Sequence, residues 1–395
     1  MRTIHAIAQP EKWDAVELKT REKTLSGNKG NRALFLFPTD RMGGAEQLTR
    51  MIARESALGK EFDHIDCFVL SRSRTGTLDH LSALPNVTLH YTGARNERRG
   101  LIALLRILAR HRYDFVFSSH THLNAFCSML RWLGMLRTRR LVTRESTLIF
   151  ERDFGGVGVL IRALYHFYGT QDMIVCQTER MRQSLNKHTN GRFSAKSLVI
   201  SNPIDLDRIN IAKREPTNIL DHIPAVATKI VWCGRLVSIK APIRALQTLR
   251  ALHHLGVPNT HLVMIGDGPL ADVVSDSVHK LGLDGHVTLC GYQSNPVAIM
   301  AHCDLGLLTS DTEGFPNVIL EMLAAGVPGV VTTNCAGDMK DIPGVWIANV
   351  PSPTALADTI VRVRELLRPS ALPDFLESRS PRHYFGQIGL QRCRQ

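Results

Sequence analysis

The sequence predicts an α/β protein that contains two doubly wound parallel sheets, each in a domain of its own. Short apolar segments alternate with helical segments along most of the chain, and this alternation is typical of strands joined by crossover helices. It stops after residue 205 and resumes near residue 230. The length of 395 residues is sufficient for two domains with separate hydrophobic cores.

Composition excludes several classes of protein. The chain is 44% hydrophobic and 21% charged, as in ordinary soluble proteins. Its eight cysteines form no C-x-x-C pair, so we expect buried thiols in a reducing compartment, and neither a metal centre nor disulfides. Residues 1–31 have no apolar core of signal-peptide length and are expected to form a variable leader. No segment reaches the roughly 18–20 apolar residues of a membrane span, so a cytoplasmic location is expected.

The net charge of +12 points to an anionic partner. Nucleic acid is not expected, because no basic segment is interleaved with aromatic residues. Arginines concentrate in two segments, Arg95–Arg112 and Arg131–Arg144, where they mix with apolar residues at helix-like spacing. Such segments suit contact with an anionic membrane surface. A helix with a solvated cationic face is the alternative.

The first domain begins with the apolar strand 33–37, followed by Gly43-Gly44 and a helix from Ala45. A double glycine lets the backbone approach a ligand closely, and the following helix N-terminus favours negative charge. The third glycine of a dinucleotide fingerprint is absent, so this is not an NAD site. A simple tight turn is the alternative.

Further strands are predicted at 65–70, 87–91, 115–118, 141–143, 173–176 and 198–200. Polar residues follow two of them, at Ser118–His122 and at Thr143–Ser146, where sheets of this kind bind ligands. His120 lies nearest its strand end and is a candidate site residue or a structural histidine. The segment 206–228 has weak periodicity and is expected to be a linker. The D-x-D pattern at Asp205–Asp207 opens this linker, so we assign it to capping or chance.

The second domain repeats the alternation, with strands predicted at 230–233, 262–265, 287–289, 305–308 and 329–331. Its first strand is followed by Arg235 and Lys240. The planar fork of an arginine and the point charge of a lysine are both well suited to a diphosphate. Surface residues without a role are the alternative.

Two glutamates, Glu313 and Glu321, flank the start of a predicted helix from Pro316 to Ala325. Pro316 suits the first helical position, and Gly326 with Pro328 ends the helix. The unpaired N–H groups at the helix start favour an anion. A helix start flanked by two carboxylates suits a ligand with both phosphates and hydroxyls, and a nucleotide-sugar has both.

These motifs resemble the family 4 retaining glycosyltransferases of the GT-B fold, from about Ala33 to Tyr384. The E-x7-E element of Glu313 and Glu321 is specific, whereas each of the other motifs is weak alone. The motifs that carry the resemblance are Gly43-Gly44-Ala45-Glu46, Asn202-Pro203-Ile204-Asp205, Gly234-Arg235-Leu236 with Lys240, Gly266-Asp267-Gly268-Pro269, and Glu313-Gly314-Phe315-Pro316-Asn317 with Glu321.

The resemblance implies two Rossmann-like domains that face each other across a cleft: 32–208 on the acceptor side and 209–370 for the nucleotide-sugar. Residues 371–395 would form a helix that crosses back onto the first domain. Glu321 would hold the ribose, and Arg235 and Lys240 would neutralise the diphosphate, with no metal or other cofactor. The donor sugar would contact Glu313 and the residues after it, namely Gly314, Phe315, Pro316, Asn317 and Val318, while Gly43 and Gly44 would close over the phosphates.

The sequence departs from the family pattern in three places. The acidic residue expected after the final glycine turn is Asp341, with Asp338 as the alternative. Ala241 follows Lys240 where relatives have glycine, and Arg144-Glu145-Ser146 replaces a histidine that commonly contacts the donor sugar. That contact passes to Glu145 or His120, or is absent.

The resemblance predicts transfer from a nucleotide-sugar, with UDP favoured over GDP, to a lipid-linked saccharide or surface polysaccharide at the inner membrane face. A nucleotide-sugar 2-epimerase and a non-catalytic nucleotide-sugar-binding protein are the alternatives.

Overall fold

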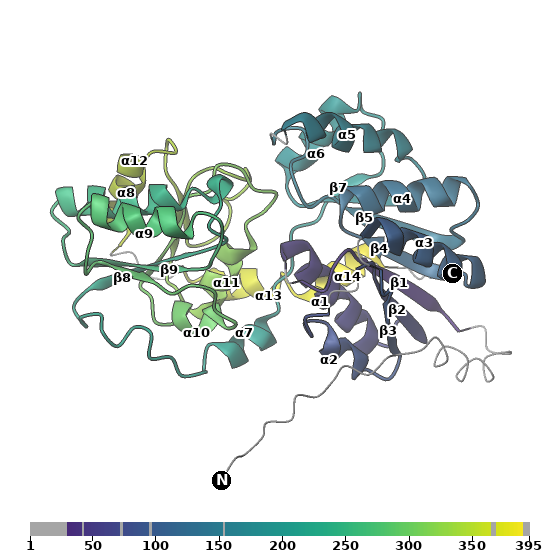
Figure 1. The fold of residues 1–395 in the computed structure, drawn as a ribbon, viewed down its shortest axis with the longest axis horizontal. Coiled ribbons are helices and arrows are strands. Elements are labelled where there is room, and N and C mark those ends of the chain that lie inside the picture. Colours follow the sequence, from purple (N-terminus) through teal and green to yellow (C-terminus); the bar gives the residue numbers. More distant parts are fainter. Residues whose placement is uncertain are drawn as a thin grey trace, which may run out of the picture.

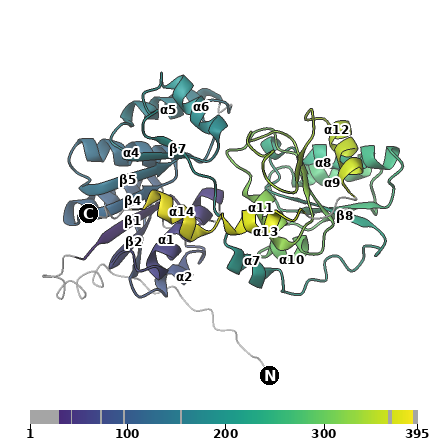
Figure 2. The same ribbon diagram turned by 180° about the vertical axis from the view of Figure 1, so that it is seen from behind.

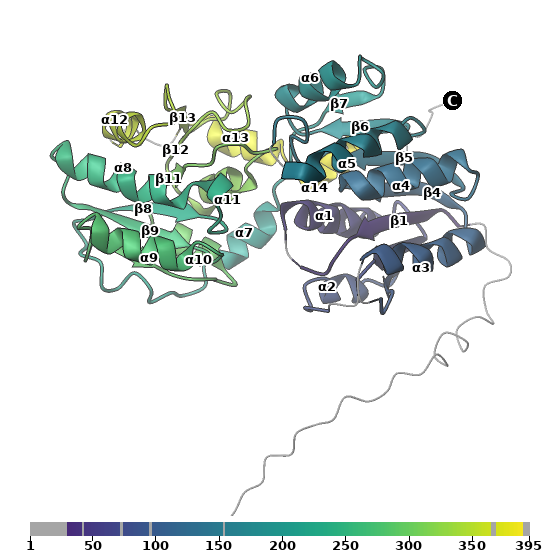
Figure 3. The ribbon, with the colours of Figure 1, turned by 45° about the horizontal axis from the view of Figure 1, so that its top comes forward.

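The computed structural model describes residues 30–41, 43–71, 74–94, 97–152, 155–364 and 369–389, the side chains of residues 97 and 98 excepted. Two parallel sheets lie side by side, and helices cover both faces of each (Figures 1 and 3). The predicted leader up to residue 29, Arg95 and the Arg98 side chain lie outside the described residues.

The first sheet has seven strands in the order β3-β2-β1-β4-β5-β6-β7, all parallel. Residues 33–37 of β1 are fully buried because α1 covers one face of the sheet, whereas α3 and α4 lie together on the other. The strands are β1 Arg32–Phe37, β2 His64–Val69, β3 Val87–Tyr91, β4 Tyr113–Ser118, β5 Thr138–Arg144, β6 Met173–Cys176 and β7 Ser197–Val199. The helices are α1 Gly44–Leu58, α2 Asp79–Ser82, α3 Glu97–Arg110, α4 Thr121–Trp132, α5 Gly158–Ala163 and α6 Glu179–His188, with 3-10 turns η1 Gly155–Val157 and η2 Leu164–Phe167.

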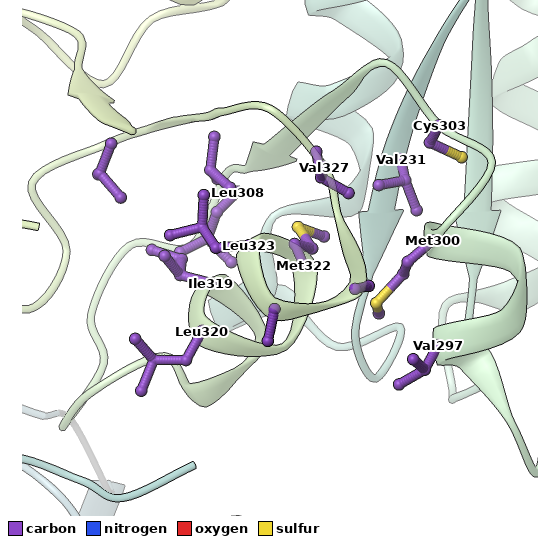
Figure 4. Packing of buried hydrophobic residues seen from close by; sticks show 14 of the residues in the cluster. Val231, Val297, Met300, Cys303, Leu308, Ile319, Leu320, Met322, Leu323 and Val327 are labelled. Atoms are coloured by element: carbon purple, nitrogen blue, oxygen red, sulfur yellow. The ribbon is translucent and has the colours of Figure 1, made fainter. Parts of the chain in front are cut away.

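The second sheet has six parallel strands in the order β10-β9-β8-β11-β12-β13. Its strands are β8 Thr228–Cys233, β9 Thr260–Ile265, β10 Val287–Leu289, β11 Leu305–Leu308, β12 Val330–Thr332 and β13 Val345–Ile347. Its helices are α7 Leu206–Ala212, η3 Ser238–Lys240, α8 Pro242–His254, α9 Ala271–Lys280, α10 Pro296–Met300, α11 Asn317–Ala325 and α12 Pro353–Val363. The apolar face of α11 packs on α10 and β8, as Ile319, Met322, Met300 and Val231 show in Figure 4.

The last two helices belong to different domains. Leu372 and Leu376 of α13 (Leu372–Glu377) are buried in the core of the second domain. Tyr384, Phe385 and Ile388 of α14 (Pro381–Ile388) are buried in the core of the first domain, against α1 and the sheet (Figure 2). The chain therefore crosses between the domains twice, after β7 and again between α13 and α14.

Three local expectations were wrong. The expected linker contains a helix, α7, because the side chain of Asp205 accepts a hydrogen bond from the backbone N–H of Arg208 and caps it. Pro316 is the N-cap of α11, one residue before the first helical position. The second arginine-rich segment is helical only as far as Trp132, the end of α4, because residues 138–144 form β5.

Candidate active site

A cavity of about 560 Å³ lies between the two domains. Its walls come from the residues that follow β1 and β4 in the first sheet and β8 and β11 in the second. In each sheet these strands are neighbours at the point where the strand order reverses, which is where open α/β sheets bind their ligands. Two such sheet edges therefore share one cavity.

Every predicted site residue except Glu145 lines this cavity. The residues brought together are Gly43, Gly44, His120, Arg235, Lys240, Glu313, Gly314, Phe315, Pro316, Asn317, Val318 and Glu321.

Helix α11 divides its side chains between the core and the cavity. Ile319, Leu320 and Leu323 are fully buried, whereas Val318 and Glu321 line the cavity on the other side. The Oε1 atom of Glu321 accepts a hydrogen bond of 3.0 Å from Nε2 of Gln47 on α1. The α11 carboxylate is thus in direct contact with the first domain.

Lys240 and Glu313 form an ion pair within the second domain. The Lys240 loop is held by Thr309 at the end of β11, whose hydroxyl contacts the carbonyl oxygens of Lys240 and Ala241, each at 2.9 Å. Ala241 adopts the left-handed conformation with φ of 46°, which glycine adopts without steric cost. The turn after Lys240 therefore has a backbone conformation that suits glycine, although an alanine occupies it.

Arg235 provides a second cation at this edge. It is exposed to solvent, and within the described part of the chain it forms no ion pair. Its guanidinium is therefore available to an anion that enters the cavity.

Two glycines bring the domains close together. A Cβ atom on Gly314 would lie 2.6 Å from the carbonyl oxygen of Ser146 and 2.8 Å from Nε2 of Gln177, both in the first domain. A Cβ atom on Gly44 would lie 3.4 Å from Nδ2 of Asn317. Because α1 and α11 both begin at the cavity wall, their unpaired N–H groups favour negative charge there.

His120 lies at the cavity wall as the N-cap of α4. Its Nε2 atom is 3.2 Å from Oε1 of Glu46, and its Nδ1 atom is buried without a hydrogen-bond partner among the described residues. The imidazole is therefore oriented by a carboxylate on α1.

Glu145 does not line the cavity, which corrects its assignment to the site. Its side chain is buried in the first domain, where the hydroxyls of Tyr165 and Tyr168 donate to it at 2.6 and 2.7 Å. Burial raises the pKa of this carboxyl, although the hydrogen bonds from the two tyrosines and Asn124 oppose the shift.

Arg144 is a cavity residue that sequence reasoning missed, because its neighbour in the sequence was preferred. Its guanidinium is 1% exposed and donates to Oγ of Ser119 and Oδ1 of Asn202, each at 2.9 Å. Asn202 in turn donates to Oδ1 of Asn317 at 2.6 Å. The alternation of strand side chains offered a signal, since it places Arg144 and Glu145 on opposite faces.

Two Rossmann-like domains with a shared cavity between their sheet edges define the GT-B class of proteins. Residues 42–208 match the family model of Glycosyltransferase Family 4, and residues 227–365 match that of Glycosyl transferases group 1. The chain belongs to this family, the group 1 or family 4 glycosyltransferases, as its motifs predicted.

Several known proteins are similar to this chain. An uncharacterized glycosyltransferase of Methanocaldococcus jannaschii is 26% identical over 47% of this chain and 45% of its own length. The N-acetylgalactosamine-N,N'-diacetylbacillosaminyl-diphospho-undecaprenol 4-alpha-N-acetylgalactosaminyltransferase of Campylobacter jejuni is 32% identical over 57% of this chain and 58% of its own. The crystal structure of Anabaena HepE in complex with UDP and glucose is also similar. The matched residues cover 90% of this chain and 97% of the HepE chain, with 18% sequence identity and a TM-score of 0.72. The chain thus spans about half the length of these curated relatives.

Proposed function

We propose that this protein is a retaining, metal-independent glycosyltransferase that moves a sugar from a UDP-sugar to a lipid-linked saccharide or surface-polysaccharide acceptor. The observation that carries the proposal is the convergence of Arg235, Lys240, Glu313 and Glu321 with two helix N-termini on one cavity. The presence of UDP and glucose in the HepE structure supports UDP as the nucleotide.

The charges of the cavity suit the departure of a nucleoside diphosphate. Negative charge grows on the diphosphate as its bond to the sugar breaks, so fixed cations and amide dipoles that face it lower the barrier. Arg235, Lys240 and the N-terminus of α11 supply these groups. Glu321 would bind the ribose hydroxyls, and Glu313 with the loop after it would bind the hydroxyls of the donor sugar.

A lipid-linked acceptor is supported by an apolar surface on the segment that leads away from the cavity. Ser146 and Thr147 line the cavity, and the described residues after them expose Val159, Leu160 and Phe167 at 75, 65 and 52%. The Campylobacter jejuni relative is named for a diphospho-undecaprenol substrate, which agrees with an acceptor of this kind.

We further propose that the protein acts at the cytoplasmic face of a membrane. Arg106 and Arg110 of α3 are exposed beside the exposed Ile102, a combination that favours an anionic bilayer surface. None of the described helices combines the length and the apolar character needed to cross a membrane. If charge reversal at Arg106 and Arg110 leaves binding to anionic liposomes unchanged, this part of the proposal is wrong.

The central experiment incubates the protein with UDP-sugars, with and without a diphospho-undecaprenol-linked saccharide. The proposal expects release of UDP together with a glycosylated acceptor. An epimerised UDP-sugar in the absence of acceptor would instead indicate an epimerase, and binding without turnover would indicate a non-catalytic protein.

Variants connect this activity to the cavity. Arg235→Ala should lower turnover about 100-fold or more, because it removes a cation from the leaving group. Arg250→Ala is the matched control, since Arg250 is an exposed arginine of α8 outside the cavity. Wild-type turnover in Arg235→Ala would contradict the assignment of Arg235.

A further inference from the structure

A second groove, of about 250 Å³, lies where the chain crosses between the domains. It is lined on one side by the segment after β7 and on the other by the junction of α13 and α14 with the adjacent face of α14. The lining residues are Val199, Ile200, Ser201, Pro203, Ser378, Arg379, Ser380, His383, Tyr384 and Gln387. None of them belongs to the cavity described above.

The groove is polar and carries positive charge. Arg379 lines it, together with the hydroxyl-bearing side chains of Ser201 and Ser380, and no carboxylate is among the described residues of its wall. Arginine without a nearby carboxylate, next to hydroxyl and amide groups, is typical of a site for an oxyanion.

Arg379 is held in place by aromatic rings. Its guanidinium lies 4.6 Å from the ring centroid of Phe375 and 5.9 Å from that of Phe315. Burial lowers the pKa of Arg379 to about 10, so the guanidinium stays protonated at neutral pH. Within the described residues its Nη1 atom is buried and has no hydrogen-bond partner.

Tyr384 forms the buried wall of the groove. Its side chain is 2% exposed, and its hydroxyl interacts with the guanidinium of Arg144 in the first domain. Buried polar atoms usually find partners, so the Nη1 atom of Arg379 is the group in this groove that points to a ligand.

Both crossings between the domains meet at this groove. The backbone N–H of Ile204, on the first crossing, donates a hydrogen bond of 2.8 Å to the carbonyl oxygen of Arg379, on the second. A ligand in the groove therefore contacts both connections at once.

We propose that this groove binds the phosphate group of a small molecule, either inorganic phosphate or a phosphomonoester, with Arg379 as its principal contact. Ser380, His383 and Gln387 supply further polar groups at its rim. The bound anion bridges the two crossings and limits the relative motion of the domains. The guanidinium of Arg379 also lies beside the ring of Phe315. Because Phe315 lines the cavity between the domains, called the donor cavity below after its proposed ligand, this contact connects the two sites.

The test is isothermal titration of the full chain with inorganic phosphate and, separately, with glycerol phosphate, at constant ionic strength set with KCl. We expect saturable binding of at least one of them. Arg379→Met, which retains an unbranched apolar stem for packing on Phe375, should weaken binding tenfold or more. His383→Glu should do the same, because His383 is exposed on α14 and the new carboxylate neutralises the groove without removing Arg379.

Controls separate this groove from the donor cavity. Binding should persist in the Arg235→Ala, Lys240→Ala double variant, which loses both cations of the donor cavity, and should not be displaced by UDP. The proposal is overturned if phosphate binds Arg379→Met and His383→Glu as tightly as the wild type, if UDP displaces it, or if neither phosphate compound binds. If glycerol phosphate binds more tightly than inorganic phosphate, the ligand is a phosphate ester. If the two compounds bind with equal affinity, the groove recognises the phosphate group alone.

Discussion

The side-chain amide of Gln47 donates a hydrogen bond of 3.0 Å to Oε1 of Glu321, from helix α1 of the first domain to helix α11 of the second. The same oxygen lies 3.5 Å from Nη2 of Arg208 on α7. Because both helices begin at the donor cavity, one carboxylate takes part in the contact between the domains and also faces the proposed ribose position. If Glu321 binds the ribose as proposed, the same carboxylate would link nucleotide binding to the contact between the domains.

Replacement of Glu321 by alanine should weaken UDP binding by about tenfold or more, since hydrogen bonds to charged groups contribute about 1.5–3 kcal/mol each. If the carboxylate contacts the ribose, 2′,3′-dideoxy-UDP should bind the wild type and the variant with equal affinity. Isothermal titration with both nucleotides measures this difference. Gln47→Ala is the control, because it removes the contact between the domains and keeps the carboxylate. Equal losses for both nucleotides would contradict the assignment of Glu321 to the ribose.

The ion pair of Lys240 and Glu313 should have separable effects on stability and on catalysis. Lys240→Met and Glu313→Gln each leave a largely buried partner without its counter-charge, and each should lower the free energy of unfolding by about 1–3 kcal/mol. The double variant removes both charges and should recover much of that stability. Sugar transfer should nevertheless remain reduced about 100-fold or more in all three variants. Urea denaturation and turnover assays, run in parallel, provide the two measurements, and recovery of transfer in the double variant would show that the pair is only structural.

Much of the fold was predictable because the strands of a parallel sheet covered on both faces are continuous apolar segments. Residues 33–37 and 305–308 are examples, and both are strands in the structure. Strand β13 was not predicted, and it is a short strand of three residues, two of which are partly exposed. The helix α7 was missed because its stability comes from the Asp205 cap and from packing on α11, neither of which produces a strong periodic pattern.

Most of the site residues that could be predicted from the sequence lie in the loops after strands. Gly43, His120, Arg235 and Glu313 lie in the loops that follow strands, and the parallel arrangement brings these loops to the same edge of each sheet. The error at Glu145 has a different origin. A single residue of register decides which face of the sheet a side chain occupies, and here Arg144 lines the cavity while Glu145 points into the adjacent core.

The buried Glu145 should make stability depend on pH. Burial raises its pKa in the folded state above the ordinary value, so the folded protein binds more protons than the unfolded chain between these two pKa values. The free energy of unfolding therefore falls as pH rises through that interval, and this contribution is fully present only below the unfolded-state pKa. Urea midpoints measured from pH 4 upward should decline more steeply for the wild type than for Glu145→Gln, which has no proton to lose.

The control for this experiment is Glu377→Gln, because Glu377 is an exposed carboxylate at the end of α13. This variant should follow the wild-type curve. Parallel curves for the wild type and Glu145→Gln would show that Glu145 has the same pKa in both states.

Ala241 offers a test of backbone conformation that is independent of the chemistry. Its φ of 46° places a Cβ atom in the left-handed region, which costs an L-residue about 1–2 kcal/mol relative to the right-handed region. Glycine removes this cost but loses about 0.5–1 kcal/mol through the greater freedom of the unfolded chain. Ala241→Gly should therefore raise the free energy of unfolding by up to about 1.5 kcal/mol. Ala251→Gly, in the interior of α8, should instead lower it by about 1 kcal/mol. Urea denaturation measures the change in the free energy of unfolding for each variant, and we expect the two changes to have opposite signs. If both variants are less stable than the wild type, the turn at Ala241 carries no strain.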